Sequence, residues 1–352
     1  MEIMNQKNKA IDFEHHMFAP EVIDYVKTRT EYPIWQEGFG ILCREGSLLP
    51  VGVPYTFPMH DPNLSLNMQQ VITDLDEYRI PYMDWAGLTC AMLSTCDCIE
   101  GLAKDDAVRL AKITNDTIAA AVRRHPDYYK GTICLPMPYV DESLKELDRA
   151  VNELGLTYWH THSNYGEKRL SDPEFEPVLA KCADLGVPFY LHPTNPTCDY
   201  LNDSGIAFSS AVFGFGADAT KTSLNLIKNG VFDRYPNLRM ILGHMGEFYP
   251  FCADRMSNRL NIYRSIDPTI KNERDIVDYF KNKNIFMTTS GIFDPEVVIF
   301  TIKEIGIDNI LLGSDYPYED FKAAIDFVKN LPISDEDKDK ILYKNAEKYI
   351  LK

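Results

Sequence analysis

Histidines and carboxylates recur in this sequence directly after short apolar runs. The first run ends in Glu14 and His16, and later runs end in His192, His244 and Asp315. Imidazole and carboxylate groups are the ligands that Zn²⁺, Mn²⁺ and Fe²⁺ accept in proteins. Taken singly, a histidine after an apolar run is usually structural, but burying several such groups at one place is costly without a purpose. The pattern therefore predicts a site for one divalent metal ion.

The register of the first run decides which of its residues belong to that site. Side chains alternate across a strand, so Glu14 and His16 share one face while His15 points to the other. This alternation selects Glu14 and His16 as ligands. A register shifted by one residue would select His15 instead.

The elements that must position these residues follow a regular rhythm. Helical spacing of apolar residues in 141–155 and 172–186 is followed each time by a strand-like run, which is typical of βαβ units. Eight such runs lie near residues 10–16, 87–93, 132–137, 156–161, 187–192, 238–244, 284–290 and 309–315. We therefore expect an α/β fold, a (β/α)₈ TIM-type barrel whose strand ends converge at one mouth. An open doubly wound sheet is the alternative.

Residues 28–80 interrupt this rhythm, because they are rich in Pro, Gly, Tyr and Asp. A long irregular insertion after the first strand of a barrel is usually a lid or a pocket wall. A peripheral elaboration or a subunit contact is the alternative interpretation. No linker or repeat divides the chain, so residues 1–352 are expected to form a single barrel domain.

Composition excludes several kinds of partner. The chain of 352 residues carries a formal charge of −16, which argues against nucleic acid or an anionic membrane as a partner. No apolar stretch is long enough for a membrane span, and the polar start shows no secretory signal. The eight cysteines are scattered without a disulfide framework, so we expect reduced thiols and a cytoplasmic protein.

Longer motifs around the polar residues resemble the amidohydrolase superfamily. They are FYLHPTNP at 189–196, ILGHMGE at 241–247 and ILLGSDYP at 310–317, with TTSG at 288–291. The resemblance runs from about residue 87 to the C-terminus. It is strongest to the nonoxidative decarboxylases related to aminocarboxymuconate-semialdehyde decarboxylase, and within them to the γ-resorcylate and 2,3-dihydroxybenzoate enzymes.

The resemblance implies roles for individual residues. The metal ligands would be Glu14, His16, His192 and Asp315, and Asp315 would also act in catalysis. The hydrolases of the superfamily usually begin with His-x-His, whereas the benzoate decarboxylases have the Glu-x-His form that is present here.

Three further positions follow from the same resemblance. His244 would be a catalytic histidine facing the substrate, with Glu247 as its partner. Arg255 would help to position or charge the substrate site.

The fourth predicted strand helps to count the metal ions. Binuclear hydrolases of the superfamily bridge two ions with a lysine there, but residues 156–163 contain none, so one ion is expected. His160, His162 and Asn164 could line the substrate pocket instead. The segment departs from the decarboxylases, whose fourth strand is apolar before an Asn or Ser. Surface or merely supporting histidines are therefore the alternative.

The expected function is metal-dependent, nonoxidative decarboxylation of a hydroxylated aromatic or related unsaturated carboxylic acid. The cofactor would be one Zn²⁺ or Mn²⁺ ion, and the substrate a small carboxylic acid. Hydrolysis of an ester, lactone or amide is the main alternative, because the same ligands serve both reactions. A hydratase and a non-catalytic binding protein are further alternatives. The resemblance also implies a homodimer or homotetramer.

Overall fold

Eight parallel strands form the centre of the molecule. The computed structural model describes residues 9–44, 47–53, 65–96, 98–203 and 205–351. In sheet order the strands are β1 (Ile11–Met17), β5 (Cys90–Thr95), β6 (Tyr129–Ile133), β7 (Tyr158–His162), β10 (Phe189–His192), β11 (Met240–Leu242), β12 (Ile285–Thr288) and β13 (Ile310–Leu311). All eight expected strands are present. Their bounds differ by a few residues, most at β6, which lies earlier in the chain than the predicted run 132–137.

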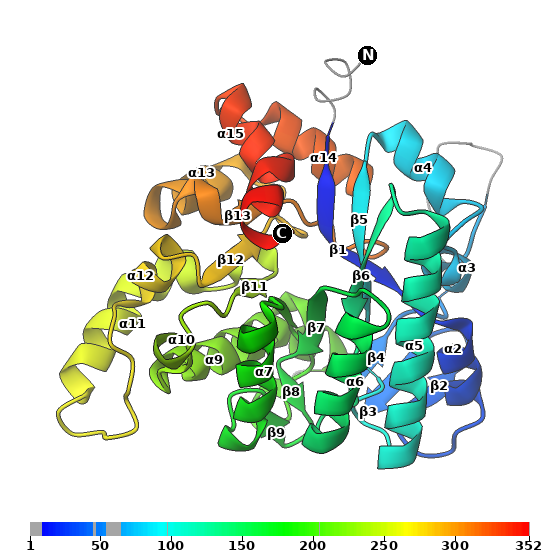
Figure 1. Ribbon diagram of the computed structural model, residues 1–352, viewed down its shortest axis with the longest axis horizontal. Coiled ribbons are helices and arrows are strands. Elements are labelled where there is room, and N and C mark those ends of the chain that lie inside the picture. Colours follow the sequence, from blue (N-terminus) through cyan, green and yellow to red (C-terminus); the bar gives the residue numbers. More distant parts are fainter. Residues whose placement is uncertain (1–8, 45–46, 54–64, 97, 204, 352) are drawn as a thin grey trace.

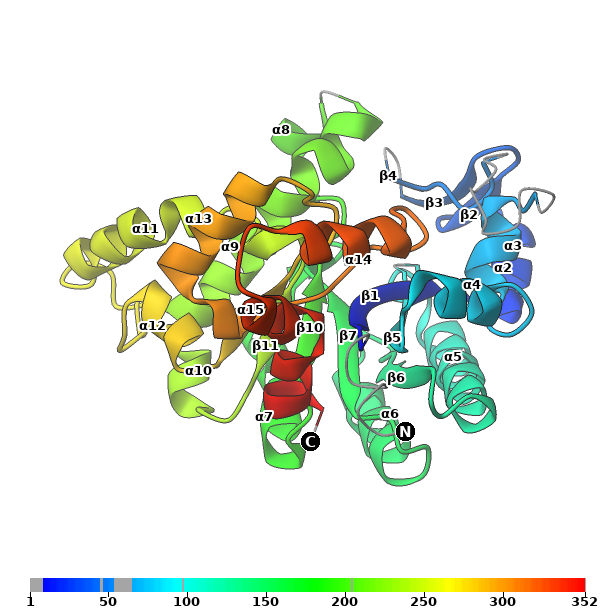
Figure 2. The same cartoon turned by 90° about the horizontal axis from the view of Figure 1, so that it is seen from above.

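The sheet closes between its first and last strands. Residues after β13 continue beside β1, where the Phe13 amide donates to the Leu312 carbonyl at 3.0 Å and the Asp315 amide to the Glu14 carbonyl at 3.0 Å. The His16 amide donates to the carbonyl of Tyr316 at 2.7 Å. The views in Figures 1 and 2 show the strands in the middle with helices around them. The expected (β/α)₈ barrel is therefore confirmed, and the open sheet is not.

Helices cover the outside of the barrel. They are α5 (Lys104–Arg124), α6 (Val140–Asn152), α7 (Glu176–Leu185), α9 (Gly214–Lys228), α10 (Val231–Arg234), α11 (Tyr249–Tyr263), α12 (Ile276–Lys281), α13 (Pro295–Ile305), α14 (Phe321–Asn330) and α15 (Asp335–Asp339). Shorter elements are β8 (Asn164–Tyr165), β9 (Lys168–Arg169), η2 (Pro173–Phe175), α8 (Asp199–Asn202), η3 (Phe208–Val212), η4 (His244–Gly246), η5 (Ile307–Asn309), η6 (Lys340–Lys344) and η7 (Ala346–Ile350). Among the described residues, no helix combines the length and apolar character needed to cross a bilayer.

Local signals in the sequence set the helix ends. Helix α7 ends at Gly186, which takes the left-handed conformation (φ 67°) that glycine adopts without strain. Helix α13 begins after Asp294, whose side chain accepts a hydrogen bond from the Glu296 amide at 2.9 Å. Such caps fix where each helix stops and where the next strand enters the barrel.

Apolar side chains fill the barrel below its C-terminal mouth. The inward-facing set includes Ile11, Phe13, Met92, Tyr158, Tyr190, Ile241, Phe286 and Leu311. The C-terminal segment η7 joins this cluster through Ala346 and Ile350, and the Tyr349 ring lies tilted against that of Phe286 with centroids 5.7 Å apart. The inside of the barrel is therefore a packed apolar core, and the polar residues that could do chemistry lie at the C-terminal mouth.

The insertion after β1 holds more regular structure than expected. It follows α2 (Pro20–Lys27) and contains an antiparallel sheet of β2 (Ile34–Gln36), β3 (Gly40–Arg44) and β4 (Ser47–Leu49), then α3 (Met68–Thr73), before α4 (Arg79–Ala86). Residues 45–46 and 54–64 lie outside the described part. Ser47 donates to the Asn195 side chain at 2.7 Å, so this sheet touches the loop after β10 at the mouth. A lid function stays a prediction.

One carboxylate anchors the seam between β1 and the chain after β13. Asp12 is fully buried and accepts hydrogen bonds from the Ser314 amide at 2.9 Å and the Ser314 hydroxyl at 2.5 Å. It also accepts one from the Glu14 amide at 3.1 Å, and His15 Nδ1 lies 2.8 Å away. The barrel closure thus depends on a side chain just before the polar cluster.

Replacing Asp12 with alanine should strip four buried donors of their acceptor. We expect Asp12→Ala to lower the free energy of unfolding by at least about 2 kcal/mol, because unsatisfied buried donors keep their full desolvation cost. Urea unfolding of the variant and of the exposed control Asp127→Ala measures this difference. Equal stability of the two variants would contradict the role of Asp12.

Candidate metal centre

A bulge in β1 sets the direction of the first two polar side chains. Asp12 pairs with Ala91 on β5 and His15 with Leu93, so three steps on β1 oppose two steps on β5. Glu14 and His16 nevertheless share the inner face, as strand alternation predicted. The bulge itself was not predicted, because nothing in the residue types marks it.

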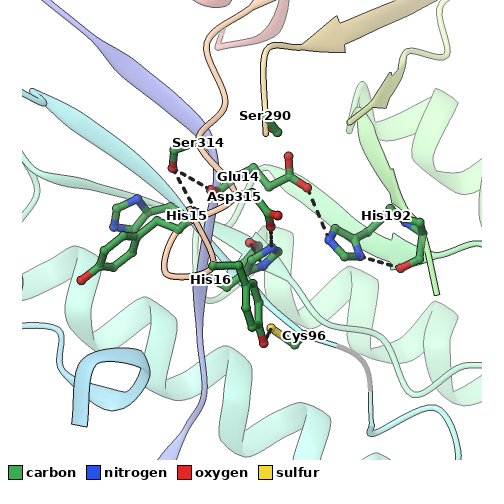
Figure 3. A network of polar contacts seen from close by, with 12 residues as sticks. Glu14, His15, His16, Cys96, His192, Ser290, Ser314 and Asp315 are labelled. Atoms are coloured by element: carbon green, nitrogen blue, oxygen red, sulfur yellow. Dashed lines mark hydrogen bonds and ion pairs between the residues drawn. The ribbon is translucent and has the colours of Figure 1, made fainter. Parts of the chain in front are cut away.

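Four side chains from three parts of the barrel meet at its mouth. His16 Nε2 lies 3.2 Å from Asp315 Oδ1, and His192 Nε2 lies 3.4 Å from Glu14 Oε1. One ligand atom from each of these residues lies within 4.8 Å of all the others. Figure 3 shows the four side chains turned toward a common centre. The structure thus brings together all four residues predicted as ligands.

Hydrogen bonds behind the imidazoles leave their inner nitrogens available. His192 Nδ1 lies 2.7 Å from the Pro193 carbonyl, so Nδ1 carries the hydrogen and donates it. Burial, together with His16 and His162, holds the pKa of His192 well below its usual range, so Nε2 of the neutral ring offers a lone pair. His16 Nδ1 lies 3.0 Å from the Ser94 hydroxyl, a contact that orients this ring with Nε2 toward the cluster.

The donor set fits a divalent cation. Glu14 Oε1 is buried with no hydrogen-bond partner among the described residues, and it faces the lone pair of His192. Two acceptors at this separation repel each other unless a positive charge lies between them. Two imidazoles and two carboxylates are a ligand set of the kind that Zn²⁺ and Mn²⁺ take. The group could hold one such ion.

The two carboxylates differ in their electrostatics. Burial raises the pKa of Glu14, and the neighbouring His244 only partly offsets this. Burial alone would also raise the pKa of Asp315, but contacts with His16 and His244 outweigh it and hold the pKa below its usual range. A bound cation would favour the ionised form of both groups.

Access to the site comes from one side. The side chains of Glu14 and His16 are fully buried, whereas those of His192, Asp315 and His244 are 13%, 19% and 22% exposed. A ligand entering through the mouth would therefore meet Asp315 and His244 first.

His15 points away from the cluster, as expected. Its ring stacks on Tyr316 with centroids 4.7 Å apart, and burial lowers its pKa to about 4. Figure 3 shows His15 on the far side of β1 from His192. The structure therefore supports the register that selects Glu14 and His16.

His244 and Glu247 form the predicted pair. His244 Nδ1 lies 2.8 Å from Glu247 Oε1, and its Nε2 lies 3.9 Å from Asp315 Oδ2. Burial would lower the pKa of His244, but Glu247 and Asp315 outweigh it and hold the pKa well above the usual range. His244, Glu247 and Asp315 all have positive φ, at 49°, 55° and 74°. Such backbone strain is typical of functional sites.

The residues predicted on the fourth strand are buried rather than on the surface. His160 lies next to the ligand histidines, and its ligand nitrogen groups with those of His16 and His192. His162 Nδ1 lies 2.7 Å from Glu100 Oε1. Asn164 donates to Asp218 at 2.8 Å.

Arg255 is the predicted site residue that the structure does not bring to the cluster. It is exposed on α11, and among the described residues no contact joins it to the ligands. Its role in substrate binding stays a prediction.

Sequence reasoning missed the residues that support the ligands. Ser94 orients His16, and Thr288 lies between Tyr190 at 3.1 Å and Glu14 at 3.5 Å. Ser94 and Thr288 end or nearly end their strands, a position that could have marked them. Gly243 also escaped notice: a Cβ there would lie 2.8 Å from the Tyr190 hydroxyl, so only glycine allows this close approach.

Comparison with known proteins now identifies the family. A family profile described as amidohydrolase matches residues 97–349, which is more than half of the chain. The chain belongs to the amidohydrolase family. Its barrel and the polar cluster at the C-terminal mouth are thus features of an amidohydrolase-family protein.

Several of the proteins that this chain is similar to are decarboxylases. The γ-resorcylate decarboxylase of Polaromonas sp. strain JS666 is 34% identical over 286 residues, which cover 78% of this chain and 87% of that protein. A solved dihydroxybenzoic acid decarboxylase of the same organism, with bound manganese and the inhibitor 2-nitroresorcinol, is 29% identical with a TM-score of 0.78, covering 97% and 96% of the two chains. The 5-carboxyvanillate decarboxylase of Sphingomonas paucimobilis is 25% identical with a TM-score of 0.83, covering 97% and 98%.

The ligand geometry makes a prediction about metal content. Protein purified without chelator should carry close to one transition-metal ion per chain, measured by elemental analysis. His16→Asn should lose that metal, whereas His15→Asn should keep it, because the His15 ring lies on the other face of β1. Metal loss only in the His15 variant, or two ions per wild-type chain, would contradict this site.

Proposed function

We propose that this protein is a metal-dependent carboxy-lyase that removes CO₂ from a hydroxylated aromatic carboxylic acid. The observation that carries the proposal is the Glu14-x-His16 arrangement, which meets His192 and Asp315 at the barrel mouth beside His244. Whole-chain similarity to a manganese-bound dihydroxybenzoic acid decarboxylase supports it.

Glu14, His16, His192 and Asp315 would hold the ion. When bound, the cation would withdraw negative charge from the carboxylate and the neighbouring hydroxyl of the substrate. The buried Glu14 and His16 would fix its position from below, whereas Asp315 faces the opening where the substrate arrives. Among the predicted substrate contacts, His162 ends β7, which lies beside β10, and Asn164 begins the short strand β8.

Proton supply is the task of His244 and Asp315. His244 holds a proton because Glu247 and Asp315 keep its pKa well above the usual range. Its Nε2 lies 3.9 Å from Asp315 Oδ2, so a small movement would pass that proton to the carboxylate. Glu247, bonded to Nδ1, would keep the ring oriented with Nε2 toward Asp315.

The reaction balances with these groups. His244 first passes its proton to the Asp315 carboxylate, and the resulting carboxyl gives that proton to the ring carbon that bears the substrate carboxylate, which forms a C–H bond and interrupts the aromatic ring. The C–C bond to the carboxylate then breaks, its electron pair restores the ring, and CO₂ leaves. Solvent then returns a proton to His244, and Asp315 is again a carboxylate.

Replacing Asp315 with asparagine tests this assignment. Asp315→Asn keeps a neutral oxygen ligand but has no titratable proton, so it should bind metal and substrate yet lose turnover by a factor on the order of a hundred or more. CO₂ release from hydroxybenzoates measures turnover, and wild-type protein in D₂O should place one deuterium on the carbon that lost CO₂. Retained turnover in the variant would assign the proton to His244 instead.

The same assay separates decarboxylation from hydrolysis. If no aromatic acid releases CO₂ while an ester, lactone or amide is cleaved in an Asp315-dependent way, the protein is a hydrolase. The ligand set alone serves both reactions, so the screen must include both substrate classes.

A homodimer or homotetramer is part of the proposal. Helix α11, at one edge of the molecule in Figure 1, and the residues after it expose large apolar side chains. Phe251, Ile262, Tyr263 and Ile266 are 67%, 56%, 50% and 75% exposed. Exposed apolar groups of this size, on one helix and on the residues directly after it, suit a subunit interface. Sedimentation equilibrium should show an oligomer that Phe251→Glu weakens, and a monomeric wild type would contradict it.

A further inference from the structure

His160 is a buried imidazole that the proposed reaction leaves without a task. It is 2% exposed, and neither ring nitrogen has a hydrogen-bond partner among the described residues. Leaving a buried donor or acceptor without a partner is costly, so such a group needs an explanation. A bound ligand that engages the ring would supply one.

The position of His160 relates it to the ligand histidines. It lies on β7 directly opposite Tyr190 on β10, and its ring stacks on the Tyr190 ring with centroids 5.4 Å apart. Its ring centroid lies 5.7 Å from that of His16 and 5.2 Å from that of His192. One of its nitrogens lies within 4.8 Å of the ligand nitrogens of both residues.

His162 provides a useful contrast, because it belongs to the same strand and the same face. Its ring centroid lies 5.4 Å from that of His160, but its Nδ1 pairs with Glu100 Oε1 at 2.7 Å. Within the part of the chain that the structure describes, the groups able to hold a metal ion include His160 and not His162.

We propose that His160 is a further ligand of the same metal ion, alongside His16 and His192. This inference rests on the metal site of the proposed function.

The ligand nitrogens favour one shared ion over a second one. His16 Nδ1 is engaged by Ser94 and His192 Nδ1 by the Pro193 carbonyl, so each ring has only Nε2 left to coordinate. The two possible ligand groups share His16 and His192 and therefore cannot each hold an ion at the same time.

The extra imidazole has a consequence for metal choice. Imidazole suits Zn²⁺, whereas oxygen ligands suit Mn²⁺, so a third nitrogen ligand shifts the preference of the site toward Zn²⁺. Removing this imidazole should therefore lower the affinity for the two metals unequally. If His160 were purely structural, its removal would distort the whole cluster and lower the affinity for both metals alike.

Chelator competition with Zn²⁺ and with Mn²⁺ tests the proposal on the full-length protein. His160→Gln should raise the dissociation constant for Zn²⁺ at least about tenfold and that for Mn²⁺ by clearly less, since even groups that only support a ligand change affinity by about 10–100-fold. The matched control His162→Gln keeps a donor for Glu100 and should leave both constants near wild type. Glu14→Gln should raise the dissociation constants for both metals.

Each other result overturns a defined part of the inference. If His160→Gln binds Zn²⁺ as tightly as the wild type, or loses affinity for both metals equally, His160 is not a ligand. If Glu14→Gln binds both metals more weakly in that case, the proposed metal site still stands. Wild-type affinity in Glu14→Gln overturns the proposed metal site and this inference together. If His160→Gln does not fold, X-ray absorption of the zinc-loaded wild type decides, with three imidazoles expected and two contradicting the proposal.

Discussion

The hydrogen bonds between β1 and the chain after β13 are the constraint on which the rest of the site depends. They close the barrel, and at the same place they set Glu14 beside Asp315. Asp12 reinforces this seam by binding the backbone and hydroxyl of Ser314. Closure of the fold and assembly of the polar cluster are therefore one event, because the residues that close the sheet adjoin the residues that face its mouth.

Burial gives the cluster its chemical character. Imidazole and carboxylate groups with little access to water are strong electron-pair donors, but gathering them at one place is costly unless a cation binds them. The apolar and aromatic layer below, which includes Tyr190 and Phe286, prevents these groups from turning down into the barrel. The partial exposure of Asp315 and His244 then leaves the reactive groups on the open side. The packing that makes burial of these polar groups costly therefore also directs their side chains toward the mouth.

Much of the fold and of the site could be predicted from the sequence, because both depend on local patterns. Alternation placed Glu14 with His16, and the rhythm of apolar runs gave all eight strands. The β1 bulge, the sheet within residues 28–80 and the support from Ser94 and Thr288 were missed, since they depend on contacts between distant segments. The pairing of His162 with Glu100 was missed for the same reason. Arg255 was placed at the site by resemblance alone, and the structure leaves it exposed on α11.

The seam also determines when the site can exist. His16 and Asp315 are 299 positions apart in the chain, yet they lie within hydrogen-bond distance. A nascent chain on the ribosome exposes Glu14 and His16 long before Asp315 has been made, and contacts of such long sequence separation form late in folding. Early fragments can therefore offer only an incomplete set of ligands. Metal binding therefore requires a completely folded barrel. The topology thus disfavours binding of a wrong ion to a partly synthesised chain.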